Sequence, residues 1–116
     1  MKQKEIIIDN KKFKITYLTE RGNYDFARSK GRTAIEVTYY PERHMLSHDA
    51  LKVLEKYTDG LLKEIRNVID ENSEFYSQFK YDLAFTEAGS QSGYNDYGQE
   101  GVITAHKRLI LQLKEL

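Results

Sequence analysis

The sequence predicts an α+β fold: a mostly antiparallel sheet of four to five strands, in the order β-β-β-α-β-β, with one long helix packed on one face. Three observations predict it. Two stretches near the N-terminus alternate apolar and polar residues, and Thr33 to Tyr40 is rich in β-branched and aromatic residues. A long stretch from Ser47 repeats apolar residues at steps of three and four. A chain of 116 residues without an internal repeat fits a single domain, 1–116.

The first two strands are predicted to form a hairpin. We expect a two-residue loop at 10–11, because this register places Ile8 opposite Phe13 and Ile6 opposite Ile15. The four apolar side chains then share one face of the sheet, as they must if only that face is buried.

The third predicted strand runs from 33 to 40. Ile35, Val37 and Tyr39 point toward one face, and polar residues alternate with them. Pro41 ends this strand, because proline cannot donate a hydrogen bond to a central ladder.

A long helix is predicted from Ser47, its expected N-cap, to about Asn72, with Gly60 inside it. The helix is about 36 Å long at 1.5 Å per residue, so it lies across the whole sheet or projects beyond it. Projecting apolar residues, Val53 among them, would suit burial in a two-fold dimer. The apolar stripe consists of Ala50, Leu51, Leu54, Tyr57, Leu61, Leu62, Ile65, Val68 and Ile69.

The C-terminal third is predicted as a strand at about 80–86, a long loop at 87–101 and a last strand at 102–114. Helix is the alternative for the first and last of these. In 102–114, a period of two favours a strand, whereas the leucine, lysine and glutamate content favours a helix.

The composition excludes several classes of function. The chain has no cysteine, which rules out disulfides, thiolate metal sites and cysteine nucleophiles. Lysine plus arginine equal aspartate plus glutamate at 18 each, so the basic excess of a typical nucleic-acid-binding domain is missing. No apolar run approaches the roughly 18 residues of a membrane span. We expect a protein of the cytoplasm, of the host or of an infected cell, that does not bind membranes.

Candidate catalytic and metal-binding groups are few. His44 and His48 are four residues apart, but His44 precedes the expected helix start, so the pair does not lie on one regular helix. Glu36 and Asp82 lie on different predicted strands and would form a carboxylate pair if those strands are neighbours. Metal-dependent nucleases usually carry a lysine two residues after such a glutamate, where this chain has Thr38. We therefore predict no catalytic residue, metal or cofactor, and a small metal-dependent hydrolase is the lesser alternative.

Two long polar segments, about 20–32 and 87–101, contain the predicted binding residues. The first interleaves cations, which bind phosphate or carboxylate, with aromatic rings that can stack on bases. The second combines tyrosine, glycine, serine and asparagine with acidic residues, which is the composition of antibody paratopes. The predicted binding residues are Arg21, Tyr24, Phe26, Arg28, Lys30, Arg32, Tyr94, Asp96 and Tyr97.

These features favour a non-catalytic binding module over an enzyme. The leading hypothesis is a small regulator or inhibitor, of a phage or mobile-element type, that engages a protein partner through both segments. The alternative is nucleic-acid or nucleotide binding through the basic and aromatic loop 21–32. A solvated loop and a disordered insertion are the plainer interpretations of the two segments. Because their charges are opposite, the segments could also meet within one chain or across a homodimer, and the balance narrowly favours a homo-oligomer.

Overall fold

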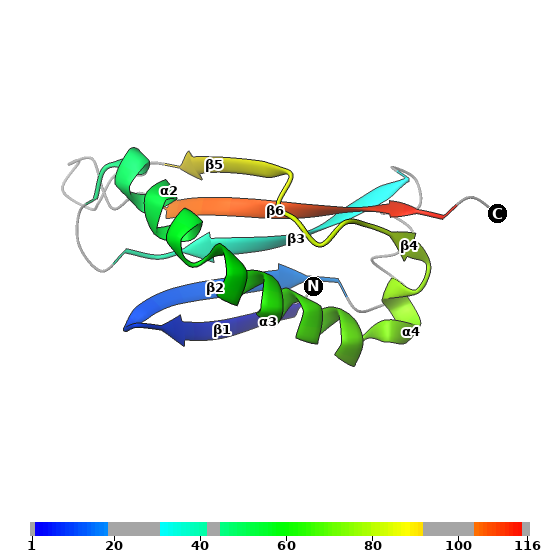
Figure 1. Cartoon of the computed structure of the whole chain (residues 1–116). Helices are drawn as coiled ribbons and strands as arrows, with labels where there is room; N and C mark the ends of the chain where they lie inside the picture. The colour runs from blue at the N-terminus through cyan, green and yellow to red at the C-terminus, as the bar shows by residue number, and fades with distance from the viewer. Residues whose placement is uncertain (1, 19–30, 42–44, 92–103, 115–116) are drawn as a thin grey trace.

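The computed structural model describes residues 2–18, 31–41, 45–91 and 104–114. Its strands form one antiparallel sheet in the spatial order β1-β2-β3-β6-β4, and β5 also pairs with β6 (Figure 1). The predicted α+β fold is confirmed, with six strands instead of four to five. The elements are β1 Lys2–Ile8, β2 Lys11–Tyr17, β3 Arg32–Tyr39, α2 Ser47–Lys56, α3 Thr58–Glu71, α4 Ser73–Tyr76, β4 Phe79–Lys80, β5 Glu87–Gln91 and β6 Thr104–Leu113.

The hairpin between β1 and β2 turns one residue earlier than predicted. Its loop consists of Asp9 and Asn10, whose φ angles of 49° and 62° are both positive. A type I′ loop needs positive φ at both positions, and aspartate and asparagine tolerate that region better than most residues. Ile6 therefore pairs with Phe13 and not with Ile15, so the predicted register is wrong. The shift of two residues keeps the apolar side chains on the predicted face.

The predicted single helix is two helices, α2 and α3, which meet at Tyr57 with φ −103° and ψ 14°. The hydroxyl of Thr58 donates a hydrogen bond to the Leu54 carbonyl at 3.0 Å. Such bonds from threonine to the preceding turn compete with the regular ladder and bend helices. The N-cap of α2 is Leu46, since Ser47 already belongs to the helix, so the predicted cap is wrong by one residue.

The C-terminal third differs most from the prediction. The predicted strand at 80–86 is wrong, because β4 ends at Lys80 and the chain then runs to β5. Leu83 and Phe85 are half-buried against the core, which explains the apolar alternation without a strand. Residues 87–91 form β5 and not the start of a loop, whereas the strand predicted at 102–114 is confirmed as β6.

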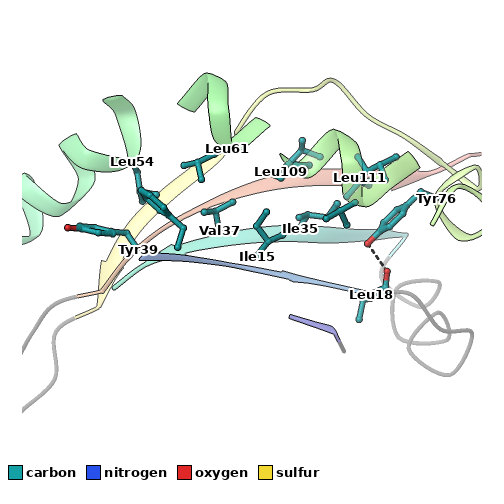
Figure 2. Close-up of a cluster of buried hydrophobic side chains, with 14 of the residues drawn as sticks. Ile15, Leu18, Ile35, Val37, Tyr39, Leu54, Leu61, Tyr76, Leu109 and Leu111 are labelled. Carbon is teal, nitrogen blue, oxygen red and sulfur yellow. Dashed lines mark hydrogen bonds between the residues drawn. The ribbon is translucent and has the colours of Figure 1, made fainter. Parts of the chain in front are cut away.

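The hydrophobic core lies between the helices and one face of the sheet (Figure 2). Side chains from α2 and α3, such as Leu54 and Leu61, point toward Ile15, Val37 and Leu109 on the strands. The described helices lie on this face alone, so the opposite face of the sheet is uncovered by any of them (Figure 1). None of these helices is long and apolar enough to cross a membrane.

Val53 does not project beyond the sheet, as the long-helix prediction suggested. It is half-buried and packs against the core. The premise of the expected dimer contact, an apolar Val53 that projects beyond the sheet, is therefore wrong.

Candidate functional site

The uncovered side of the sheet, which we call the open face, carries mostly polar side chains. They alternate along each strand with the side chains of the core, because successive residues of a strand point to opposite faces. The open face consists of Gln3, Glu5 and Ile7 on β1, Lys12, Lys14 and Thr16 on β2, Arg32, Ala34, Glu36 and Thr38 on β3, Thr104, His106, Arg108, Ile110 and Gln112 on β6, Lys80 on β4, and Glu87 and Gly89 on β5.

An ion-pair network occupies the centre of the open face. Glu36, Arg108 and Glu87 are direct neighbours in one row across β3, β6 and β5. The Arg108 Nε donates to Glu36 Oε2 at 2.6 Å, and its Nη1 lies 3.6 Å from Glu87 Oε2. The Thr38 hydroxyl donates to the other Glu36 oxygen at 3.3 Å.

The charged groups of this network are paired with one another. The hydrogen bond with Glu36 raises the pKa of Arg108 above its ordinary value, so the guanidinium stays charged. Both oxygens of the Glu36 carboxylate already accept hydrogen bonds. Glu36 is therefore held as a structural ion-pair partner and not as a free general base.

Two shallow hollows flank the neighbouring pair Ala34 and Ile110 on the open face. The first has a volume of about 240 Å³ and is lined by Thr16, Tyr17, Leu18, Ala34, Glu36 and Arg108. The second has a volume of about 320 Å³ and is lined by Lys80, Tyr81, Asp82, Thr86, Ile110 and Gln112. Glu36 and Asp82 thus line different hollows, and the structure does not bring them together as the carboxylate pair that we considered.

A third hollow of about 270 Å³ lies at the hairpin end of the sheet, lined by Asp9, Asn10, Lys11, Lys12, Tyr39, Tyr40 and Met45. The Lys14 ammonium stands 5.1 Å from the centre of the Tyr40 ring, within the range of a cation–π contact. This end of the open face therefore combines an exposed aromatic ring with cations. All three hollows lie at or below the lower end of the roughly 300–1,000 Å³ typical of small-molecule sites.

Arg32 is the predicted binding residue that the structure describes. It is exposed on the open face at the start of β3, opposite Gln112 of β6. Lys80 lies beside Gln112 on its other side, so two cations flank one glutamine in this row. The other predicted binding residues lie outside the described residues: Arg21, Tyr24, Phe26, Arg28, Lys30, Tyr94, Asp96 and Tyr97.

The strands that border the two predicted binding segments place those segments at opposite ends of the sheet. Residues 19–30 join the end of β2 to β3, whose first residue, Arg32, pairs near the C-terminal end of β6. Residues 92–103 join β5 to β6, where Gln91 pairs with Thr104 at the N-terminal end of β6. The two points of departure are about 30 Å apart along the ten residues of β6.

A buried hydrogen bond fixes the chain just before residues 19–30. The Tyr76 hydroxyl donates to the Leu18 carbonyl at 2.6 Å (Figure 2). Burial raises the pKa of Tyr76 well above its ordinary value, so the phenol stays protonated and donates. The chain is therefore anchored to the core at Leu18, just before the first predicted binding segment.

The structure describes two of the three histidines, His48 and His106. His44 lies outside the described residues, and His48 is exposed in the first turn of α2. His106 is half-buried on the open face, where its ring lies over Gly89: a Cβ added there would come within 2.9 Å of its Nε2. Within the described ranges, no three histidine, aspartate or glutamate side chains are grouped so that they could hold a metal ion.

Sequence reasoning missed most of the open face. The alternation of β3 and β6 marked polar positions as a solvent side, but nothing local showed which strands would be neighbours. Lys107 was also missed; it is the one charged side chain buried in the described part of the chain. It lies on the core face of β6, where its ammonium bonds the carboxylate of the largely exposed Glu55 side chain and lies 5.7 Å from the centre of the Phe85 ring. Lys107 is therefore a residue of the fold and not of the site.

A scan against protein-family models, a search of the curated proteins and a search of the solved structures found no match to this chain.

Proposed function

We propose that the chain is a non-catalytic module that binds a protein partner through residues 20–32 and 87–101, with the open face between them. The observation that carries the proposal is that the two segments leave the sheet from opposite ends of this broad, charge-paired face. In the same proposal, it is a small regulator or inhibitor of a phage or mobile-element type, in the cytoplasm of the host or of an infected cell.

The shape of the open face supports a macromolecular partner over a small substrate. A small-molecule site usually buries most of its ligand in a deep, mainly apolar cleft. The hollows on either side of Ala34 and Ile110 are small and open to solvent. Broad, shallow surfaces with charged neighbours are typical of contacts between proteins.

The charges of the open face support a protein over a nucleic acid. Cations and carboxylates alternate there: Lys12 lies 3.5 Å from Glu5, and Arg108 lies between Glu36 and Glu87. The carboxylates would repel a polyanion, whereas a protein surface can present both signs in a matching pattern.

One observation favours nucleic-acid or nucleotide binding as the second candidate. Arg32 and Lys80 flank Gln112 at the end of the sheet where residues 19–30 begin and end. With the predicted cations Arg21, Arg28 and Lys30, they would give this end a local basic excess. Such a site predicts binding that weakens steeply with salt.

The test compares partner capture by three forms of the full chain: the wild type, the Tyr94→Ala/Tyr97→Ala variant and a Lys63→Ala/Arg66→Ala control. The control changes two exposed residues on α3, away from the open face. We expect the double tyrosine variant to lose the captured protein while its melting temperature stays unchanged, and the control to retain it. Full capture by the tyrosine variant would remove the second segment from the proposal.

The nucleic-acid alternative is tested on the same preparation. Light scattering, with absorbance at 260 and 280 nm, measures the mass and any bound nucleic acid in low and high salt. Nucleic acid that is bound at low salt and released at high salt would favour the second candidate. A protein free of nucleic acid at both salt concentrations would leave the protein partner as the proposal.

A further inference from the structure

We propose that the free edge of β1 pairs with β1 of a second copy of the chain, antiparallel and centred on Ile6, so that the two sheets join into one. This contact goes beyond the proposed function, because it uses the backbone edge of β1 and neither of the two binding segments. It is a self-association surface, and a second copy is its occupant.

Strand β1 is a long, regular edge. It is the last strand on its side of the sheet, and it pairs with β2 along all seven residues. The other edge is interrupted: β4 has two residues and β5 has five, and the stretch 81–86 between them forms no strand. Short and broken edges resist pairing with another chain, whereas a long regular edge invites it.

The hairpin geometry shows which backbone groups are free. In a two-residue hairpin, the residues that flank the loop, Ile8 and Lys11, form a hydrogen-bonded pair, and the pairs then alternate along the ladder. The N–H and C=O groups of Gln3, Glu5 and Ile7 consequently point away from β2. A seventh strand would satisfy them.

The side chains along this edge favour association. Ile7 is 72% exposed, and no other large apolar side chain in the described residues is more exposed. Charged residues on an edge normally discourage pairing, but here they have partners in their own chain. Lys4 lies 3.5 Å from Glu64, and Glu5 lies 3.5 Å from Lys12.

Symmetry limits the possible registers. Antiparallel pairing of a strand with its own copy needs a two-fold axis normal to the sheet, and residues opposite each other then point to the same face. The axis therefore passes through a residue pair. Centred on Lys4 or on Glu5, the pairing opposes two like charges. Centred on Ile7 or on Ile8, it keeps only three residues or one residue of β1, because the strand ends at Ile8 and Asp9 turns away with φ 49°. Like charges directly opposite are destabilising.

The register centred on Ile6 avoids these conflicts. It places Ile6 against Ile6, Lys4 against Ile8 and Glu5 against Ile7 of the second copy. The outward backbone groups of Glu5 and Ile7 then meet each other twice across the axis. This register alone combines apolar contact at the axis, no opposed like charges and an overlap that runs from Lys4 to Ile8, so the charges and the length of β1 together select it.

The first test measures the mass of the full chain by sedimentation equilibrium across a range of concentrations, for the wild type, Ile7→Glu and Ile7→Lys. Ile7→Glu opposes Glu5 of the second copy, and symmetry makes this conflict occur twice. Ile7→Lys opposes the same carboxylate with a cation. We expect a concentration-dependent dimer that Ile7→Glu weakens roughly tenfold relative to Ile7→Lys.

Differences in monomer stability between the two variants would not produce the predicted order of dimer affinity. Position 7 is exposed and pairs with Lys12 within its own hairpin, so Ile7→Glu gains an attractive neighbour in the monomer and Ile7→Lys a repulsive one. If the association followed monomer stability, Ile7→Lys would be the weaker dimer. The proposal predicts the reverse order.

The second test uses the absence of cysteine from the chain. Ile6→Cys places two thiols opposite each other in a non-hydrogen-bonded pair, and mild oxidation should link two copies covalently. Lys2→Cys is the control on the same face of β1, because its counterpart would be about 27 Å away. A link at position 6 and not at position 2 supports the register.

Several results would overturn the proposal. A constant monomer mass at all concentrations would show that β1 does not pair with β1 of a second copy. A dimer unaffected by Ile7→Glu would use another surface, and equal linking at positions 2 and 6 would indicate random collision. Capture of a partner through Tyr94 and Tyr97 is tested with the Tyr94→Ala/Tyr97→Ala variant and not with these variants, so the two proposals fail separately.

Discussion

Replacing Tyr76 by phenylalanine removes one buried hydroxyl and little else. The Tyr76 side chain is 2% exposed, and its hydroxyl donates to the Leu18 carbonyl at 2.6 Å. The ring would keep its contacts with Phe75 and Phe79, at 5.0 and 6.4 Å between centres. The Leu18 carbonyl would lose a partner in a place that water does not easily reach, and an unsatisfied buried acceptor costs about 1–3 kcal/mol.

This cost converts into a measurable change of melting temperature. At about 2.1 cal/mol/K per residue, the unfolding entropy of 116 residues is about 0.24 kcal/mol/K. We therefore expect Tyr76→Phe to lower the melting temperature by roughly 4–12 °C in a calorimetric scan. Tyr57→Phe is the matched control: its hydroxyl donates to Asp9 Oδ2 at 3.0 Å on the surface, where water can replace it. Equal shifts for the two variants would refute the argument from burial.

Three further outcomes follow from other contacts. Burial raises the pKa of Tyr76 above its ordinary 10.0, so its contribution to the free energy of unfolding is fully present below pH 10 and is lost at higher pH as the phenol of the unfolded chain ionises. Urea unfolding between about pH 9 and 11 should therefore show a steeper loss of stability for the wild type than for Tyr76→Phe. Glu55→Ala leaves the Lys107 ammonium without its carboxylate and should cost about 0.5–1 kcal/mol in urea unfolding, because the Glu55 end of the pair is exposed to solvent; Lys107→Met in the same chain should restore most of this loss. Asn10→Gly relieves a left-handed backbone with φ 62° and should stabilise the chain by about 0.5–1 kcal/mol in the same assay, while Asn10→Val should destabilise it.

The parts of the fold that could be predicted are those recorded locally in the sequence. The alternation of Ile35, Val37 and Tyr39 predicts a strand because each of these side chains is buried on one face. The repeat that includes Leu54 and Leu61 predicts helix because both residues point into the same core. Burial on a single face leaves a period in the sequence, and the period is readable without knowledge of the partners.

The parts that were wrong depend on distant partners or on fine backbone preferences. A hairpin register shifted by two residues keeps every side chain on its face, so alternation cannot distinguish the two registers, and the turn preference of Asp9 and Asn10 decides. Strand β5 has little apolar character of its own. It forms because Glu87 and its neighbours pair with β6, and Arg108 lies 21 positions further along the chain from Glu87.

The composition of the sequence predicted the candidate site, but it could not predict where the two segments lie relative to the sheet. Segments 20–32 and 87–101 have the residues of contact surfaces, but their sequence does not show that they leave the sheet about 30 Å apart. The row that contains Glu36 and Arg108 exists only after β3 and β6 pair. Because this row neutralises its own charges, the centre of the open face offers little free charge, and in the proposed function specificity would come from the two ends of the sheet.

The proposed dimer would change which segments share one end of the sheet. A two-fold axis normal to the sheet reverses the second copy, so the strand ends that border segment 20–32 of one copy would lie at the same end of the joined sheet as those that border segment 87–101 of the other. One partner surface along this end could then contact a basic and an acidic segment, whose points of departure are about six strand spacings, or roughly 29 Å, apart. Ile7→Glu should therefore weaken partner capture as well as self-association if the dimer is the binding form. Unchanged capture by a monomeric Ile7→Glu variant would show that each end of the sheet binds on its own.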